Sequence, residues 1–189
     1  MSHDEIRALF EKTRAILSGH FILTSGRHSD TYVQCALVLQ FPDYAERLGA
    51  KLAAQFKGTK VECVVGPALG GIIVAHEVAR ALGVRAVFTE RVDGVMRLRR
   101  GFNVAPGERV LAVEDVVTTG GSVKEAADAV EALGAHIIGY GALIDRSGGK
   151  VSFAAPFRTL LGLNAETWDP ADCPLCGEGI PAIKPGSRR

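Results

Sequence analysis

Short apolar runs rich in β-branched residues alternate with helix-like segments through the middle of the chain. Apolar residues at helical spacing lie over 71–82 and 122–133. The apolar runs themselves are VECVVG at 61–66, VRAVFTE at 84–90, RVLAVE at 109–114 and AHIIGYGALID at 135–145. Continuous apolar strands separated by helices are typical of a mostly parallel sheet covered by helices on both faces. The pattern therefore predicts an α/β fold with an open, twisted sheet.

Two helices and a pair of strands are predicted before this region. Ser2 and Glu5 have the spacing of a capping box, and apolar residues then recur at helical intervals as far as Leu17. A second helix is expected to follow Pro42–Asp43. Between the helices, short alternating apolar stretches predict two strands around a turn at Ser25–Gly26–Arg27.

Composition narrows the class of protein without identifying it. The chain has 189 residues, 47% of them hydrophobic, which is enough for one domain with a sizeable core. Lys and Arg total 22 against 21 for Asp and Glu, so the charge balance gives no sign of a nucleic-acid or membrane-surface partner. The charged N-terminus does not resemble a signal peptide, and no apolar run has the length of a membrane helix, so a cytoplasmic location is expected. The four cysteines are then expected to be thiols.

The stretch from Arg109 to Val130 carries the candidate chemistry. Glu114 and Asp115 should project at the carboxyl end of the strand Val110–Val113, where open α/β sheets bind ligands. Buried neighbouring carboxylates are stabilised by ligand hydroxyls or a cation. The following TTGGS segment offers hydroxyls and free N–H groups at a helix start, which suits a phosphate. The simpler alternative is a glycine-rich turn with a Ser/Thr cap.

The segment from Glu114 to Ser122 resembles the phosphoribosyl-diphosphate motif of the type I phosphoribosyltransferases. That motif is an apolar strand, two acids, two apolar residues, a Thr/Ser/Gly loop and a helix. The resemblance implies an α/β core of about residues 43–150 and a small hood from about 18–42 with part of 150–189, all in one domain. It also implies that the following residues bind phosphoribosyl diphosphate: Glu114, Asp115, Val116, Val117, Thr118, Thr119, Gly120, Gly121 and Ser122.

Three further stretches are similar to the orotate-specific branch of this family. Phe21–Ser29 resembles the hood segment that closes over the base, and Val64–Gly71 resembles the strand and loop that hold pyrophosphate. Leu143–Arg146 ends where the branch places an arginine that binds the orotate carboxylate, a geometry that guanidinium groups suit. An ion pair between Arg146 and Asp145 or another surface acid is the alternative. The implied contacts are Thr118 and Arg146 for orotate, Ala68, Leu69 and Gly70 for pyrophosphate, and Thr24, Ser25, Gly26 and Arg27 in the hood.

An arginine-rich stretch, 89–102, matches the family's mobile catalytic loop in position. In the family's dimers this loop reaches the neighbouring subunit's site and covers the departing pyrophosphate, a task for which cations are suited. Arg91 is the main catalytic candidate beside Glu114 and Asp115. Arg97, Arg99 and Arg100 are further candidates, although a run of arginines is often a solvated face. The resemblance also implies a homodimer and Mg²⁺ held mainly through the substrate, without a firm protein ligand.

Some positions depart from the common pattern of the branch. Thr24 stands where many relatives have lysine, and Leu69-Gly70-Gly71 replaces a loop that often carries one. Three alternatives for the function stay open: transfer to another base (uracil, xanthine or adenine), a phosphoribosyl-diphosphate-sensing regulator, and a ligand-free structural domain.

At the C-terminal end, the Gly- and Pro-rich stretch from Cys173 predicts a loop or tail. Cys173 and Cys176 have the spacing of half a zinc site, but the two other ligands are not evident, so packing or a turn is the favoured interpretation.

Overall fold

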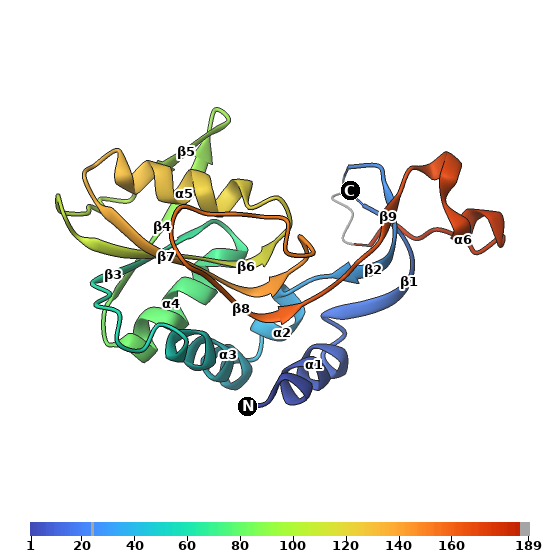
Figure 1. Cartoon of the computed structure of the whole chain (residues 1–189), viewed down its shortest axis with the longest axis horizontal. Coiled ribbons are helices and arrows are strands. Elements are labelled where there is room, and N and C mark those ends of the chain that lie inside the picture. The colour runs from blue at the N-terminus through green and yellow to red at the C-terminus, as the bar shows by residue number, and fades with distance from the viewer. Residues whose placement is uncertain (24, 186–189) are drawn as a thin grey trace.

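The computed structural model describes residues 1–23 and 25–185 and contains two sheets. A six-stranded sheet with flanking helices forms the core, and a three-stranded sheet projects from one end of it (Figure 1). The helices are α1 (His3–Lys12), α2 (Ala36–Leu39), α3 (Pro42–Ala54), α4 (Gly70–Leu82), α5 (Gly121–Glu131), α6 (Pro174–Gly177) and the 3₁₀ turn η1 (Pro170–Asp172). The strands are β1 (Ile16–Ile22), β2 (His28–Val33), β3 (Cys63–Pro67), β4 (Arg85–Val92), β5 (Val95–Leu98), β6 (Arg109–Val117), β7 (His136–Asp145), β8 (Phe157–Gly162) and β9 (Thr167–Trp168).

The core sheet has the order β5-β4-β3-β6-β7-β8. Every neighbouring pair is parallel except β4 and β5, so the predicted mostly parallel α/β sheet is confirmed. Helices α3 and α4 cover one face and α5 covers the other (Figure 1). The carboxyl ends of β3, β6 and β7 consequently lie at one edge of the sheet, where the two predicted binding loops follow β3 and β6.

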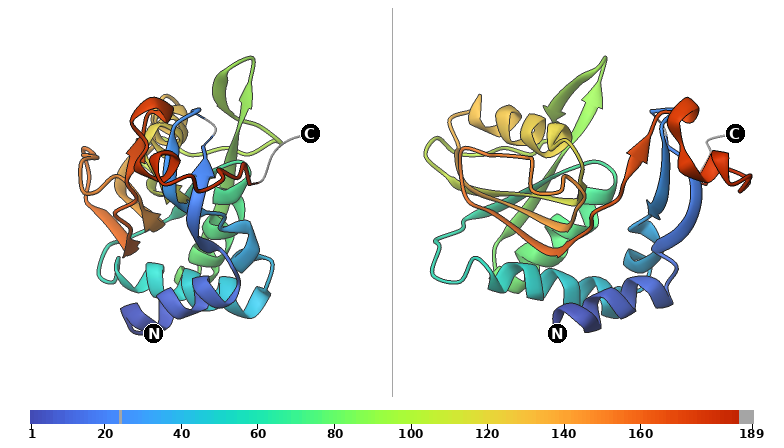
Figure 2. Two further views of the ribbon diagram at one scale, coloured as in Figure 1. Left: turned by 90° about the vertical axis from the view of Figure 1, so that its right-hand side faces the viewer. Right: turned by 45° about the vertical axis from the view of Figure 1, so that its right-hand side comes forward.

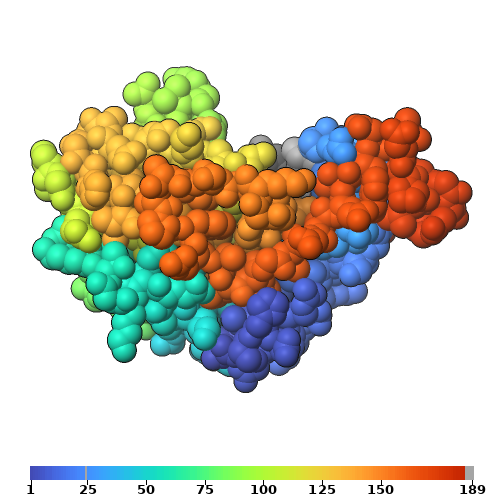
Figure 3. Space-filling model, viewed as in Figure 1, coloured from blue at the N-terminus to red at the C-terminus, as the bar shows by residue number. Residues whose placement is uncertain are grey.

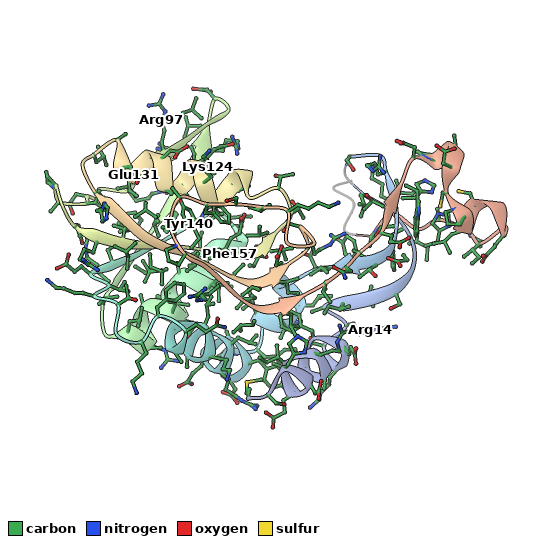
Figure 4. All side chains as sticks on the ribbon, viewed as in Figure 1. Arg14, Arg97, Lys124, Glu131, Tyr140 and Phe157 are labelled. Carbon is green, nitrogen blue, oxygen red and sulfur yellow. The ribbon has the colours of Figure 1, made fainter. Side chains whose placement is uncertain are left out.

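Side chains alternate between the two faces of the sheet along the buried strands, and they contribute to two separate apolar clusters. Val64 and Leu111 point to the side of α3 and α4, whereas Val65 and Ala112 point to the side of α5. Below α5, the ring of Tyr140 stacks on Phe153 with centroids 4.2 Å apart, and Figure 4 labels Tyr140 and Phe157 on this side. Burial on both faces explains why these strands are continuous apolar runs.

The first helix is shorter than the sequence predicts. It begins with the predicted capping box, in which the Ser2 and Glu5 side chains bond to each other's backbone N–H, but it ends at Lys12. Arg14 has a φ of 57°, and the N–H groups of Arg14 and Ala15 bond back into the last turn, as in a Schellman motif. The prediction that the helix continues to Leu17 is wrong, because Ile16 and Leu17 already belong to β1.

The two predicted strands around Ser25–Gly26–Arg27 are β1 and β2, which pair antiparallel. Strand β9 adds to the outer edge of β2, and α6 with the C-terminal segment lies beside this small sheet (Figure 2). Figure 3 shows the β1–β2 segment, in blue, and the C-terminal segment, in red, together forming one end of the molecule. We call β1, β2, β9 and residues 169–185 the hood.

The C-terminal stretch from Cys173, predicted as a loop or tail, is a loop with the short helix α6, and it packs against β1. Cys173 is buried, and Ile183 bridges to Phe21 of β1, with its N–H donating to His20 O and its carbonyl accepting from Ile22 N–H. Strand β8, in a stretch where no strand was predicted, completes the core sheet. Within residues 1–23 and 25–185, no helix is long and apolar enough to cross a membrane.

Candidate active site

Strand β6 carries both predicted acids, but it is longer than predicted. It continues to Val117 because Val116 and Val117 still pair with Ile144 and Asp145 of β7. Glu114 and Asp115 therefore lie within the strand, not beyond its end, and alternation directs their side chains to opposite faces.

Both carboxyl groups are held in surroundings that favour the protonated form. Burial, followed by the charge of Asp115, raises the pKa of Glu114 from 4.5 to about 8, against an opposing hydrogen bond from Val123 N–H. Burial also raises the pKa of Asp115, although Val116 N–H donates to its Oδ1 at 3.0 Å. Two acids so placed gain stability from a ligand that supplies hydroxyl donors or positive charge.

The predicted pyrophosphate loop lies directly against Asp115. Gly70 begins α4, and its Cα approaches the Asp115 carboxyl group so closely that a Cβ would collide with it. Gly66, at the end of β3, packs against Gly71 in the same way. The structure thus brings Ala68, Leu69 and Gly70 together with the acids of β6, and Leu69 is 81% exposed at this edge.

Gly70→Ala is expected to lower the free energy of unfolding by about 1–3 kcal/mol, because the new methyl group must displace the half-buried carboxyl group of Asp115. Alanine is otherwise the better helix residue by about 1 kcal/mol, so propensity works against this loss. Gly121→Ala is the matched control, since Gly121 also begins a helix but a Cβ there meets only Thr119 Oγ1, at 3.5 Å. Urea unfolding measures both; equal effects of the two substitutions would contradict the collision.

The loop from Thr118 to Gly120 leads into α5 with an open N-terminus. Gly120 is the N-cap residue in the left-handed region (φ 76°), and it provides no side-chain cap. A Cβ at Gly120 would also lie 2.9 Å from Phe153 and Val151, so both conformation and packing require glycine. Thr119 Oγ1 accepts the Gly121 N–H only at 3.4 Å. This helix start therefore presents backbone N–H groups and hydroxyls to an anion.

A cavity of about 1560 Å³ opens between the hood and the carboxyl ends of β6 and β7. Predicted residues from three segments line it, namely Ser25, Arg27, Thr118, Thr119 and Arg146. Thr24 lies outside the described residues, and Glu114, Asp115 and residues 68–70 are not among the lining residues. Lys150 and Lys184 also line the cavity and were missed by the sequence analysis, which assigned part of 150–189 to the hood but named neither lysine as a site residue.

The surroundings of Arg146 suit an anionic ligand. Its Nε is buried and has no hydrogen-bond partner among the described residues. Burial lowers the pKa of Arg146, with Asp30 and Tyr32 acting in the opposite direction. The alternative partner Asp145 accepts the Ser147 N–H at 2.7 Å. The Arg146 side chain lines the cavity, and a guanidinium in a cavity wall is suited to a carboxylate ligand.

Arg27 is occupied within the hood. Its guanidinium donates to Asp169 at 3.0 Å and to the Thr167 carbonyl at 2.7 Å, which ties the turn between β1 and β2 to the C-terminal segment. It lines the cavity with part of its side chain, so it shapes the wall as well as carrying charge there.

The arginine-rich stretch forms the β4–β5 hairpin, not the loop that the sequence analysis predicted. Asp93 and Gly94, both with positive φ, make the two-residue turn that favours a hairpin. Arg91 pairs with Glu125 of α5 at 2.7 Å, and Arg100 forms two bonds of 2.7 Å with Glu90. Arg97 projects from the hairpin beyond α5 (Figure 4). None of the described residues that line the cavity comes from 89–102, so one chain does not bring these arginines to its own cavity.

This fold and loop define a phosphoribosyltransferase domain: a family model described as "Phosphoribosyl transferase domain" matches residues 40–171, and the chain belongs to that family. A protein from Pelotomaculum thermopropionicum called orotate phosphoribosyltransferase is 59% identical over 189 residues, which is 100% of both chains. Among solved structures, the chain is similar to Mycobacterium tuberculosis orotate phosphoribosyltransferase in complex with 5-phospho-α-D-ribosyl 1-diphosphate. That similarity has a TM-score of 0.67 at 25% identity and covers 85% of this chain and 96% of the other.

The fold alone does not define the base that is transferred. Adenine phosphoribosyltransferase from Thermoanaerobacter pseudethanolicus shares it with a TM-score of 0.60 at 21% identity, covering 70% of this chain and 88% of the other. The choice of base therefore has to be argued from full-length similarity and from the residues that line the cavity, which include Arg146.

Proposed function

We propose that this protein transfers the phosphoribosyl group of 5-phosphoribosyl 1-diphosphate to orotate, giving orotidine 5′-phosphate and pyrophosphate in pyrimidine biosynthesis. One observation carries the proposal: Arg146 lines the same cavity as Thr118 and Thr119, which lead into the open start of α5, and this arrangement suits a ligand pair with a carboxylate and a phosphate. The 59% identity to a protein called orotate phosphoribosyltransferase supports the same substrate. Pyrophosphate release with orotate, compared with uracil, xanthine and adenine, tests it.

Each binding loop receives one part of the substrates. The 5′-phosphate binds at residues 118–122, where the α5 N–H groups favour an anion. The ribose hydroxyls bind at Glu114 and Asp115, and the pyrophosphate lies near Ala68–Gly70, next to Asp115. The orotate carboxylate pairs with Arg146, while Thr118 contacts the base.

The chain's own residues lower the barrier mainly by orientation and charge. As pyrophosphate leaves, positive charge grows on the ribose, and the nearby acids of β6 stabilise it. Orotate is already an anion, so a strong general base is not required. The hood and the pyrophosphate loop position the two substrates and limit water, which would hydrolyse the sugar diphosphate.

Mg²⁺ fits the donors present. Glu114 and Asp115 are half-buried carboxyl groups with raised pKa values, Asp115 lies against the pyrophosphate loop, and a cation near this part of β6 would offset the repulsion between the two groups. Mg²⁺ commonly binds through one or two carboxylates, waters and substrate phosphates. Glu114 and Asp115 would hold it through the ribose hydroxyls or water, and the ion would supply charge neutralisation on the pyrophosphate. The Mg²⁺ requirement and the cytoplasmic location stay predictions.

The β4–β5 hairpin acts in a homodimer, across the subunit boundary. Arg91, Arg97, Arg99 and Arg100 are all exposed and lie away from their own cavity, which supports a role at a partner's pyrophosphate. In this arrangement, mixing inactive Arg91→Ala protein with inactive Glu114→Gln/Asp115→Asn protein should restore activity. Half of randomly re-formed dimers would be mixed, each with one complete site, so about a quarter of wild-type activity is expected. No recovery after confirmed subunit exchange would contradict action in trans.

A further inference from the structure

Four metal-binding side chains from distant parts of the chain converge in the hood. They are His20 of β1, His28 of β2, Cys173 at the N-cap of α6 and Cys176 within α6. One ligand atom from each lies within 4.8 Å of all the others. The cluster is separate from the cavity, whose lining includes none of the four.

The distances within the cluster are those of a tetrahedral site. His20 Nε2 lies 2.8 Å from His28 Nδ1 and 3.4 Å from Cys173 Sγ. Cys176 Sγ lies 3.3 Å from His28 Nδ1 and 3.8 Å from His20 Nε2. Zinc with its usual Zn–N and Zn–S bond lengths places tetrahedral ligand atoms about 3.3–3.8 Å apart. Of these four distances only that between the two nitrogens is shorter, and a shift of about half an ångström would accommodate the ion.

The surroundings orient His20 as a ligand. Its Nδ1 lies 2.7 Å from the Ile180 carbonyl oxygen, which can only accept, so the proton of the neutral ring resides on Nδ1. The Nε2 lone pair then points to the other three side chains. A histidine fixed through its second nitrogen by a carbonyl is the usual arrangement around a protein metal ion.

Burial and the backbone also favour a metal over chance packing. His20, His28 and Cys173 are 2%, 8% and 4% exposed, which is unusual for histidine in so small a sheet. The register between β1 and β2 shifts between Ser18 and Phe21, so that His20 is buried next to buried Phe21. Thiol and imidazole ligands in an S₂N₂ set select zinc among the common metals.

We propose that His20, His28, Cys173 and Cys176 bind one structural zinc ion that fastens the C-terminal segment to the β1–β2 hairpin. Strand pairing holds the C-terminal segment to the hairpin only weakly, because β9 pairs with β2 at only two positions, His28 to Trp168 and Ser29 to Thr167. A metal supplies the missing stability in small units of this kind. By fixing His28, it also fixes the neighbouring Arg27 and the cavity wall that Trp168 lines.

Metal analysis of the full chain, purified without a polyhistidine tag, tests the proposal. We expect about one zinc per chain, and replacement by Co²⁺ should give the visible bands of a tetrahedral site with thiolate ligands. The Cys173→Ser/Cys176→Ser protein should contain less than about a tenth of a zinc per chain and melt about 5 °C or more below wild type. Cys63→Ala removes a buried thiol outside the cluster and should keep the zinc.

Three results would overturn the proposal. They are a wild-type protein without zinc after incubation with equimolar Zn²⁺ under reducing conditions, zinc retained in the double serine variant, and cobalt spectra without thiolate bands. Because the wild-type measurements do not depend on the variant folding, a poorly folded serine variant leaves the proposal fully testable.

Discussion

Replacing Glu114 with Gln and Asp115 with Asn together is expected to lower turnover by about 10²- to 10³-fold while raising thermal stability. Turnover falls because an amide has no negative charge with which to stabilise the positive charge that develops on the ribose. Stability rises because the folded chain no longer buries two groups whose ionised forms are disfavoured. Steady-state kinetics and thermal unfolding measure the two effects.

The stability gain should depend on pH. The raised pKa of Glu114, about 8 instead of 4.5, means that between these values the unfolded chain releases a proton that the folded chain keeps. The stability of the wild-type protein therefore falls as pH rises through this window, by up to about 1.4 kcal/mol per pH unit from this group. The variant lacks this loss, so its advantage in melting temperature should be larger at pH 8 than at pH 5.

Asp128→Asn/Glu131→Gln is the matched control, because it makes the same two kinds of replacement at exposed positions of α5. It should keep wild-type turnover and show no such pH-dependent gain. Wild-type turnover in the Glu114→Gln/Asp115→Asn protein would show that these acids have no catalytic role.

Arg146→Ala is expected to raise the KM for orotate by about 10- to 150-fold, while the KM for phosphoribosyl diphosphate changes little. The reason is the loss of a charge-assisted hydrogen bond worth about 1.5–3 kcal/mol. Arg146→Lys should recover only part of the affinity, since an ammonium group lacks the two-pronged geometry of guanidinium. Initial rates with each substrate varied in turn separate the two constants.

Arg158→Ala serves as the control, because Arg158 is an exposed arginine on the neighbouring strand β8 and does not line the cavity. An unchanged orotate KM in Arg146→Ala would refute the role of Arg146. An equal rise for both substrates would indicate a general disturbance of the cavity in place of carboxylate recognition.

The core sheet and the part of the site between β6 and α5 could be predicted, because the residues that determine them are contiguous in the sequence. The strand, acids and TTGGS loop from Arg109 to Ser122 are contiguous, and only a buried strand followed by a helix accommodates them. The position of Arg146 follows from the length of β7. Thr118, Thr119 and Arg146 meet in one cavity because the parallel strands β6 and β7 end at the same edge of the sheet.

Other features depend on signals that the sequence does not display. The end of α1 uses Arg14 (Figure 4) in a left-handed position where glycine is usual, so no residue type marks it. The Asp93–Gly94 turn does mark the β4–β5 hairpin, but the arginines around it led to a loop being predicted.

The four-residue cluster of the hood shows a different limit. His20 and Cys173 are 153 residues apart, and the CxxC motif shows only half of the ligands. Pairing them requires knowing that the C-terminal segment returns to β1, which depends on tertiary contacts such as that of Ile183 with Phe21.

Pyrophosphate release from 5-phosphoribosyl 1-diphosphate, with Mg²⁺ and one base at a time, tests the proposed function most directly. Orotate should support release together with formation of orotidine 5′-phosphate, and uracil, xanthine and adenine should give only the background rate. Equal or faster release with another base, or no release with orotate under conditions in which the protein binds the sugar diphosphate, would contradict the account.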